Sequence, residues 1–311
     1  MSKPIAAYTD IVQCDPGEGV RMLEDAGFEV RVIDSADPTV IAEHARGASA
    51  LLIGYSGVDR ALLDALPDLR IVATQSVGTD MVDVAEAERR GIVVSTVPDA
   101  AVEEVATHAF AMVMALLRGL PFLDREVRTG DWDGTTMTLR RPSETTIGVV
   151  GLGRIGRKLA SLMAPVCKDV VGYDPMIGPD NWPSEVRRVE FDTVLGASDV
   201  ISLHLPLSQH THHLIGSAEL TAMREGASIV NVSRGGLVAQ DALLEHLDSG
   251  HLASAALDVL AQEPPPRDDP IRTHPRVLVS PHVAYMSEGS KRDYVVRQAR
   301  NVIDWHRTAA P

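Results

Sequence analysis

Short apolar runs alternate with amphipathic stretches along most of the chain. In the first hundred residues, runs such as 50–53 are entirely apolar, whereas stretches such as 59–65 repeat apolar positions with the spacing of a helix. The strands predicted in this part span residues 4–8, 29–33, 50–53, 70–73 and 92–95. Because strands that alternate with helices form parallel sheets covered by helices on both faces, this part predicts an α/β unit.

A long apolar helix is predicted next, over about residues 101–118, with Glu103 and Glu104 in its first turn. The helix dipole favours acidic side chains at this position. Its apolar part is too short for a membrane span, so we expect a buried helix that ends before Pro121. The segment 122–143 contains two glycines and a proline. We expect it to be irregular and to pack against another subunit.

The alternation of strands and helices resumes after residue 145. The strands predicted there span residues 146–150, 170–173, 200–203, 228–232, 255–258 and 277–280. Residues 287–305 predict one or two closing helices. The second half of the chain is therefore a second α/β unit, and 311 residues are enough for two domains.

Charge and cysteine content restrict the class of protein. The chain has 29 Lys and Arg against 43 Asp and Glu, a formal net charge of −14, with no basic run. This balance opposes binding to nucleic acid. Cys14 and Cys167 are too few for a disulfide framework, and the first ten residues lack the apolar core of a secretion signal. We therefore expect a cytoplasmic protein that binds neither nucleic acid nor membrane.

A glycine-rich turn follows the predicted strand at 146–150. Gly151 permits the tight turn, Gly153 allows a pyrophosphate to approach the backbone, and Gly156 allows close packing of helix on strand. Asp174 follows the next predicted strand, 18 residues after Gly156, where an acid that binds a ribose is expected. A carboxylate there accepts a hydrogen bond from the free ribose 2′-hydroxyl of NAD and repels the 2′-phosphate of NADP. The pattern therefore predicts NAD rather than NADP. The alternative is that Asp174 only begins a turn.

Three charged residues stand at or just past the ends of predicted strands: Arg234, Asp258 and His282. In an open α/β sheet, ligands bind at this edge. An NAD enzyme that acts on a hydroxy or oxo acid needs a cation for the carboxylate and a proton donor, which an arginine and a histidine paired with an acid such as Glu263 supply. Taken singly, each residue has another interpretation. Arg234 could belong to a surface loop, Glu263 could be a solvated charge in a linker, and His282 could be a buried histidine of the core.

The chain resembles the D-isomer-specific 2-hydroxyacid dehydrogenases over nearly its whole length. The resemblance is carried by Val77-Gly78-Thr79-Asp80, the glycine turn, His204-Leu205-Pro206-Leu207 with Thr211, and the segments around Arg234, Glu263 and His282. Glu263 lies 29 residues after Arg234, and His282 lies 19 residues after Glu263. Tyr285-Met286-Ser287-Glu288 is most similar to the branch that contains the C-terminal-binding-protein co-repressors and their bacterial dehydrogenase relatives. Met81 and Thr107 depart from the residues common in the family.

The resemblance implies a role for each matching residue. Arg234 would bind the substrate carboxylate and polarise the keto oxygen, and His282 would transfer the proton while Glu263 stabilises the imidazolium. Ser76, Val77 and Gly78 would complete the substrate site, Arg154 and Ile155 would cover the pyrophosphate, and Asp258 would hold the nicotinamide carboxamide. The other residues implied to contact NAD are Gly151, Gly153, Gly156, Val77, Asp174, Leu205, Pro206, Thr211, Val232, Ser233 and Ala284.

The implied architecture is a Rossmann NAD-binding domain, residues 100–283, inserted into a flavodoxin-like substrate domain made of residues 1–99 and 284–311. The family implies a homodimer. The implied activity is reversible hydride transfer between NAD(H) and a small 2-oxo or 2-hydroxy acid of the glyoxylate, hydroxypyruvate or phosphoglycerate type. The alternative is an NAD-sensing, co-repressor-like binding protein with little catalytic activity. No metal is expected, because the histidines near residue 210 lie in a polar loop without ligand spacing.

Overall fold

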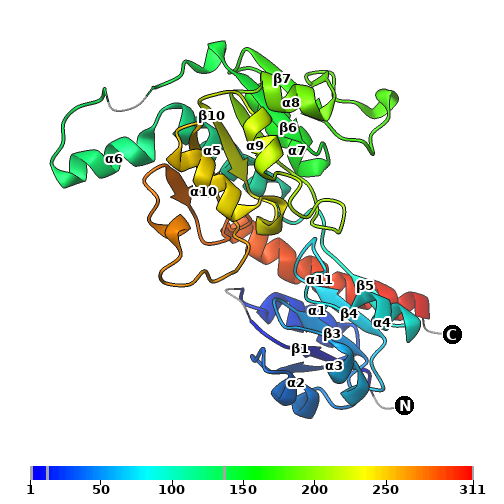
Figure 1. Cartoon of the computed structure of the whole chain (residues 1–311). Coiled ribbons are helices and arrows are strands. Elements are labelled where there is room, and N and C mark those ends of the chain that lie inside the picture. Colours follow the sequence, from blue (N-terminus) through cyan, green and yellow to red (C-terminus); the bar gives the residue numbers. More distant parts are fainter. Residues whose placement is uncertain (1–2, 12–13, 136–137, 310–311) are drawn as a thin grey trace. The chain divides into compact units, whose positions relative to one another are not determined.

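The computed structural model describes residues 3–11, 14–135 and 138–309. The chain forms two compact units, one made of Met1–Ala101 with Met286–Pro311 and the other of Val102–Tyr285 (Figure 1). The predicted crossings, after residues 99 and 283, lie close to these boundaries. Each unit contains its own parallel sheet with helices, so the predicted α/β class is confirmed.

The unit that holds the N-terminal residues has a five-stranded sheet in the order β2-β1-β3-β4-β5, with every neighbouring pair parallel. This is the strand order of flavodoxin-like folds. Its elements are β1 (Ile5–Tyr8), α1 (Gly17–Asp25), β2 (Glu29–Val32), α2 (Pro38–His44), β3 (Ala50–Ile53), α3 (Arg60–Ala65), β4 (Ile71–Thr74), α4 (Val84–Arg89), β5 (Val93–Ser95) and α11 (Glu288–Ala309).

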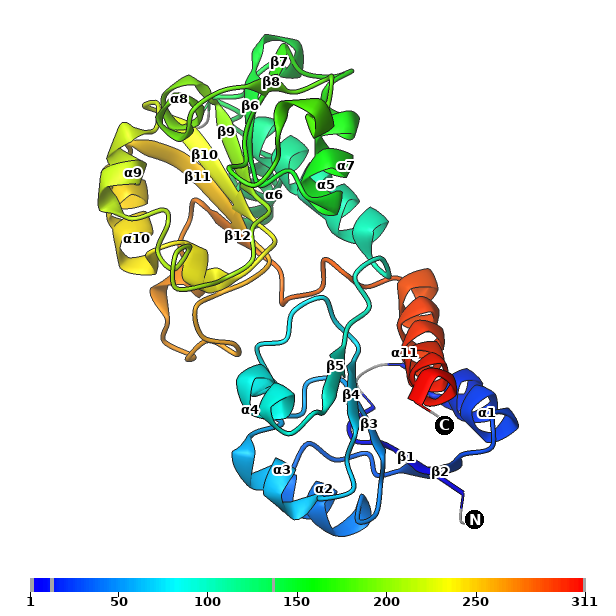
Figure 2. The same cartoon turned by 90° about the vertical axis from the view of Figure 1, so that its right-hand side faces the viewer.

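Two helix layers cover this sheet. Helices α2, α3 and α4 supply apolar residues to the core on one face, and α1 and α11 supply those on the other. Figure 2 shows α11 and α1 side by side. Gln298 of α11 is buried and donates from Nε2 to the carbonyl oxygens of Ile53 and Ala73, at 3.0 and 2.7 Å. The last helix therefore completes the unit that the first strand begins.

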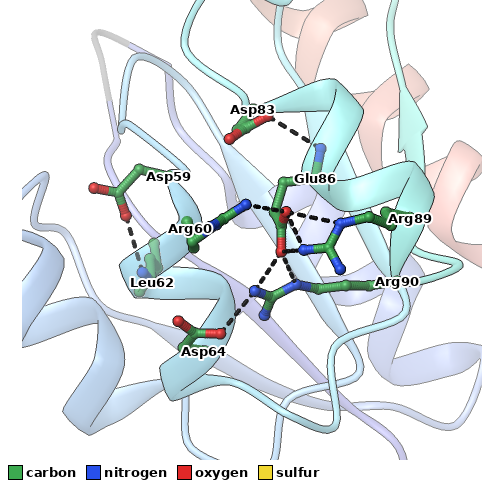
Figure 3. A network of polar contacts seen from close by, with 8 residues as sticks. All are labelled: Asp59, Arg60, Leu62, Asp64, Asp83, Glu86, Arg89 and Arg90. Atoms are coloured by element: carbon green, nitrogen blue, oxygen red, sulfur yellow. Dashed lines mark hydrogen bonds and ion pairs between the residues drawn. The ribbon is translucent and has the colours of Figure 1, made fainter.

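A buried carboxylate joins α3 to α4 in the same unit. Glu86 is 3% exposed and accepts hydrogen bonds from Arg60, Arg89 and Arg90, and Arg90 also donates to Asp64 at 2.7 Å (Figure 3). Hydrogen bonds from Arg89 and Arg90 lower the pKa of Glu86 to about 2. The network keeps this carboxylate charged although the carboxylate itself is covered from solvent.

The second unit has a seven-stranded sheet in the order β12-β11-β10-β9-β6-β7-β8, again with parallel neighbours. The order reverses between β6 and β9, the place where doubly wound folds bind ligands. Its elements are α5 (Val102–Leu117), α6 (Leu120–Thr129), β6 (Thr146–Val150), α7 (Arg154–Met163), β7 (Asp169–Tyr173), β8 (Arg187–Arg188), α8 (Phe191–Ala197), β9 (Val200–Leu203), α9 (Ser217–Ala222), β10 (Ala227–Asn231), α10 (Gln240–Asp248), β11 (Leu252–Leu257) and β12 (Val277–Val279).

The segment predicted to be irregular over 122–143 begins instead as a helix, α6. Pro121 lies in the first turn of this helix, where its missing N–H removes no hydrogen bond, and Phe122 is buried. The prediction was wrong because Pro121 was taken as the end of helical structure. The irregular part starts at Asp131, and residues 136 and 137 lie outside the described residues. Helix α6 and the segment after it extend beyond the sheet of their unit (Figure 1).

Among the described residues, no helix taken alone has the length and apolar composition of a membrane span. Helices α5 and α6 reach that composition only as a pair, and their axes meet at 57°.

Candidate active site

The glycine turn lies between β6 and α7. Gly151 has a φ of +92°, and a Cβ atom on it would stand 2.4 Å from the carbonyl oxygen of His204. A Cβ atom on Gly156 would stand 2.0 Å from the carbonyl oxygen of Gly151, whereas one on Gly153 would meet no atom within 4 Å. Two of the glycines are therefore required by packing, and the third leaves open space at the N-terminus of α7. Free backbone N–H groups at such a terminus bind phosphate.

Asp174 follows β7 and is bound to this turn. Its Oδ2 accepts the backbone N–H of Leu152 at 2.8 Å, and its Oδ1 accepts that of Met176 at 2.9 Å. The second bond is the turn contact that was the alternative interpretation of this residue. A carboxylate oxygen accepts more than one hydrogen bond, so both oxygens retain capacity for ribose hydroxyls. Open space at Gly153, the helix terminus and this carboxylate together fit a dinucleotide.

The segment after β9 lies against the glycine turn. His204 Nε2 is 2.9 Å from the Ser202 hydroxyl, and burial lowers the pKa of His204 to about 4, so the imidazole is neutral. The hydroxyl of Thr211 donates to the carbonyl oxygen of Pro206 at 2.7 Å and accepts the N–H of Ser208 at 2.8 Å. Thr211 thus closes the loop that contains Leu205 and Pro206, which are half-buried and exposed, respectively.

Arg234 follows β10 in a loop that Asn231 fixes. The side chain of Asn231 accepts the N–H of Ser233 at 3.0 Å and donates to the carbonyl oxygen of Arg234 at 2.8 Å. Val232 is buried, and the Ser233 hydroxyl donates to the carbonyl oxygen of Leu203 at 2.8 Å. The Arg234 side chain is half-buried. The guanidinium of Arg234 also donates to the carbonyl oxygen of Ser233 at 2.8 Å, so side chains on both sides fix the loop conformation.

His282 and Glu263 form a hydrogen-bonded pair. The Nδ1 atom of His282 lies 2.6 Å from Oε2 of Glu263, and Oε1 of Glu263 accepts the N–H of Leu260 at 2.8 Å. Burial opposes charge on Glu263, but the bonds from His282 and Leu260, with the charge of Arg234, hold its pKa below the usual value. Because the acid is ionised, Nδ1 of His282 is the donor, and Nε2 is left to exchange a proton. A cavity of about 470 Å³ adjoins the pair.

The backbone of His282 is held in a conformation rare for a residue with a side chain, with a φ of +52°. Its N–H donates to the carbonyl oxygen of Asp258 at 2.8 Å. The Asp258 carboxylate accepts the N–H groups of Val283 and Ala284, at 3.0 and 2.9 Å, and the hydroxyl of Ser280. Asp258 therefore organises the loop that carries His282. Its expected contact with the nicotinamide carboxamide stays a prediction.

The structure brings Glu263, His282 and the charge of Arg234 together in the unit that carries the glycine turn. Ser76, Val77 and Gly78 belong to the other unit, in the loop after β4. There the Ser76 hydroxyl donates to the carbonyl oxygen of Gly78 at 2.5 Å, and Val77 is 53% exposed. Their expected contact with substrate stays a prediction.

Two residues near His282 were not singled out from the sequence as site residues: Ser280 and His108. No sequence spacing connects His108, in the long apolar helix, with a loop 172 residues away. Among the described residues, no group of three or more His, Cys, Asp or Glu side chains lies close enough together to hold a metal ion.

A doubly wound sheet with a glycine turn, an acid after the second strand and a histidine–glutamate pair defines a dinucleotide-binding α/β protein with a proton-transfer site. The family model described as D-isomer specific 2-hydroxyacid dehydrogenase, NAD binding domain, matches residues 110–284. The chain belongs to this family. The resemblance noted in the sequence and the prediction of NAD as cofactor are confirmed.

Named relatives give the same assignment. The chain is 36% identical to a glyoxylate reductase of Korarchaeum cryptofilum, over 95% of this chain and 92% of that protein. It is 34% identical to a D-3-phosphoglycerate dehydrogenase of Archaeoglobus fulgidus, over 86% of this chain, but it spans only 51% of that longer protein. A solved D-lactate dehydrogenase of Aquifex aeolicus, in complex with NAD and lactic acid, has a TM-score of 0.86 at 26% identity and covers 97% of this chain and 96% of its own.

Proposed function

We propose that the protein is an NAD-dependent D-2-hydroxyacid dehydrogenase that reversibly reduces a small 2-oxo acid of the glyoxylate or hydroxypyruvate type. The observation that carries the proposal is the 2.6 Å bond between His282 and the ionised Glu263, in the same unit as the glycine turn. The similarity to a glyoxylate reductase extends over nearly all of that protein, whereas the chain spans about half of the phosphoglycerate dehydrogenases that it matches. The similarity to a glyoxylate reductase, at 36% identity over 92% of that protein, supports the smaller substrates.

Arg234, His282 and Glu263 each have a separate role in the proposed reaction. NAD, when bound, accepts or supplies the hydride. Arg234 binds the substrate carboxylate and polarises the oxygen at carbon 2. In reduction, Nε2 of His282 gives its proton to that oxygen, and in oxidation it removes the proton from the hydroxyl. Glu263 keeps Nδ1 protonated and stabilises the imidazolium that exists before reduction and after oxidation.

The test is NADH oxidation with glyoxylate, hydroxypyruvate, pyruvate and 3-phosphohydroxypyruvate. We expect turnover of at least one of the first two, and a loss of about 10²- to 10⁴-fold in kcat for His282→Ala with unchanged NADH affinity. His246→Ala is the control, because His246 lies on α10, where its ring bonds to Ala242 and Thr221 and contacts the ring of His251. Wild-type turnover in His282→Ala would contradict the proposal. Tight NADH binding without turnover of any 2-oxo acid would favour the co-repressor-like alternative.

We also propose a homodimer formed through α6 and the segment that follows it. Four large apolar side chains among the described residues there are exposed: Leu120, Val127, Trp132 and Leu139, at 61, 48, 89 and 38%. Exposed apolar groups on one projecting segment are typical of a protein interface. Sedimentation at micromolar concentration should show a dimer for the wild type and a monomer for Trp132→Glu, whereas a monomeric wild type would remove this proposal.

The cytoplasm is the compartment that we propose. Cys14 is buried and Cys167 is half-buried, and both are free thiols, as expected in a reducing environment. The net charge of −14 supports a small-molecule substrate rather than a nucleic acid or anionic membrane as partner. Fractionation of the producing cells, with recovery in the membrane or secreted fraction as the contrary result, tests the compartment.

A further inference from the structure

A chain of hydrogen bonds leads from α5 to the loop that carries His282. The Nε2 atom of His108, on α5, lies 3.1 Å from the hydroxyl oxygen of Ser280, and that hydroxyl donates to Oδ1 of Asp258. A serine hydroxyl has one hydrogen, so Ser280 must accept from His108. This assigns a hydrogen to Nε2 of His108, which also lies 3.7 Å from Oδ1 of Asp258.

Asp258 accepts most of the hydrogen bonds that hold the loop carrying His282. Its side chain is 1% exposed, and its carboxylate and carbonyl oxygens together accept hydrogen bonds from Ser280, His282, Val283 and Ala284. A φ of +52° at His282 persists only when the surroundings determine it. The direction in which His282 points therefore depends on how firmly the Asp258 carboxylate is held.

We propose that His108 and Ser280 are positioning residues for His282. The N–H of His108 holds the Ser280 oxygen, which keeps the serine hydrogen directed at Asp258 and the carboxylate directed at the loop. Neither His108 nor Ser280 donates or accepts the proton of the reaction. Without the His108 donor, the Ser280 hydroxyl is free to rotate, the loop gains freedom, and Nε2 of His282 spends less time in the reactive position. The inference rests on the proposed function, because it concerns the same histidine.

Four single variants test this role. His108→Leu removes the donor, Ser280→Ala removes the hydroxyl, and His108→Gln places an amide N–H at similar reach. His246→Leu is the matched control. Nε2 of His246 also lies 3.1 Å from a hydroxyl, that of Thr221, but His246 lies on α10 and not in the loop that carries His282.

We expect kcat to fall about tenfold in His108→Leu and in Ser280→Ala, because small displacements of a reacting group cost one to two orders of magnitude in rate. The KM for NADH should change less than kcat, and the deuterium isotope effect measured with 4-deuterated NADH should rise because the chemical step becomes slower. His108→Gln should recover most of the rate. His108→Leu combined with Ser280→Ala should be no slower than either alone, because both break one chain. Additive losses, or equal losses in His108→Gln and His108→Leu, would overturn the proposal.

A second measurement is independent of turnover. The ¹⁵N resonance of Nδ1 in His282 reports its bond to Glu263, and it should shift or broaden in His108→Leu and Ser280→Ala but not in His108→Gln or His246→Leu. If the wild type reduces no 2-oxo acid, the proposed function fails, and this resonance still decides the positioning role. If His108→Leu does not fold, Ser280→Ala, which removes a single oxygen atom, decides it. An unchanged resonance in a folded variant would refute the inference.

Discussion

The carbonyl oxygen of Gly151 lies 2.0 Å from the position that a Cβ atom would take on Gly156. The backbone of the turn thus packs directly on the first turn of α7, and no flexible side chain stands between them to move aside.

The glycines of the turn should therefore respond differently to substitution by alanine. Gly156→Ala should lower the free energy of unfolding by about 3 kcal/mol or more, since overpacking against backbone is costly. Gly153→Ala should leave the free energy of unfolding within about 1 kcal/mol of wild type, because its Cβ enters open space, but should weaken NADH binding about tenfold or more. Urea unfolding and NADH fluorescence titration measure the two effects. Equal loss of stability in both variants would contradict the assignment.

The effect of Glu263 on His282 should depend on the negative charge of Glu263 and on the length of its side chain. Glu263→Gln keeps the shape but loses the charge that stabilises the imidazolium, so kcat should fall about 10²-fold or more with little change in the NADH dissociation constant. Glu263→Asp keeps the charge and shortens the side chain, and its kcat should lie between those of the wild type and Glu263→Gln. Steady-state rates with the best 2-oxo acid provide the comparison, and full activity in Glu263→Gln would disprove the role.

The choice between NADH and NADPH should depend on Asp174. Asp174→Ser removes the charge that repels a 2′-phosphate, so the ratio of kcat/KM for NADPH to that for NADH should rise about tenfold or more. The same change removes the acceptor for the Leu152 N–H, so some loss of affinity for both cofactors is expected. Asp180→Ser, at an exposed site nearby, is the control and should leave the ratio unchanged.

The acid stability of the unit that contains α4 should depend on Glu86. Its pKa is about 2 in the folded chain and near 4.5 when unfolded, so its contribution is fully present above pH 4.5 and is lost as the pH falls towards 2. Glu86→Gln should destabilise the protein at pH 7 and flatten the pH dependence of the unfolding free energy between pH 5 and 3. Glu88→Gln, exposed on the same helix, should match the wild type. Urea unfolding at several pH values separates these results.

Sequence patterns predicted the sheets well because most strands are buried on both faces and are therefore mainly apolar, as in β3, which is apolar throughout. They failed where that signal is absent. Strand β8 consists of two exposed arginines at the edge of the sheet, and nothing in its composition indicates a strand. Helix α6 was missed because a proline that begins a helix and a proline that ends one look alike without the neighbouring structure.

The candidate site could be predicted as far as each residue belongs to a local motif. The glycine turn, Asp174, Arg234 and His282 each follow a strand, and Glu263 lies 29 residues after Arg234 and 19 before His282. By contrast, the contact of His108 with Ser280 joins positions 172 residues apart, and it depends on how α5 packs beside β11. Such contacts leave no spacing to detect, and only the folded chain reveals them.

The position of α11 has a consequence for synthesis on the ribosome. Residues Ala299, Val302 and Ile303 complete the core that begins with Ala6 and Tyr8. The strands made first therefore have only α1 over one apolar face while the whole of the other unit is translated. The unit with the glycine turn can reach its native packing from a continuous stretch of chain. The unit that contains the N-terminal residues cannot do so until residues 288–309 have been synthesised. Nascent chains that end before residue 288 should thus expose the first sheet to chaperones and proteases.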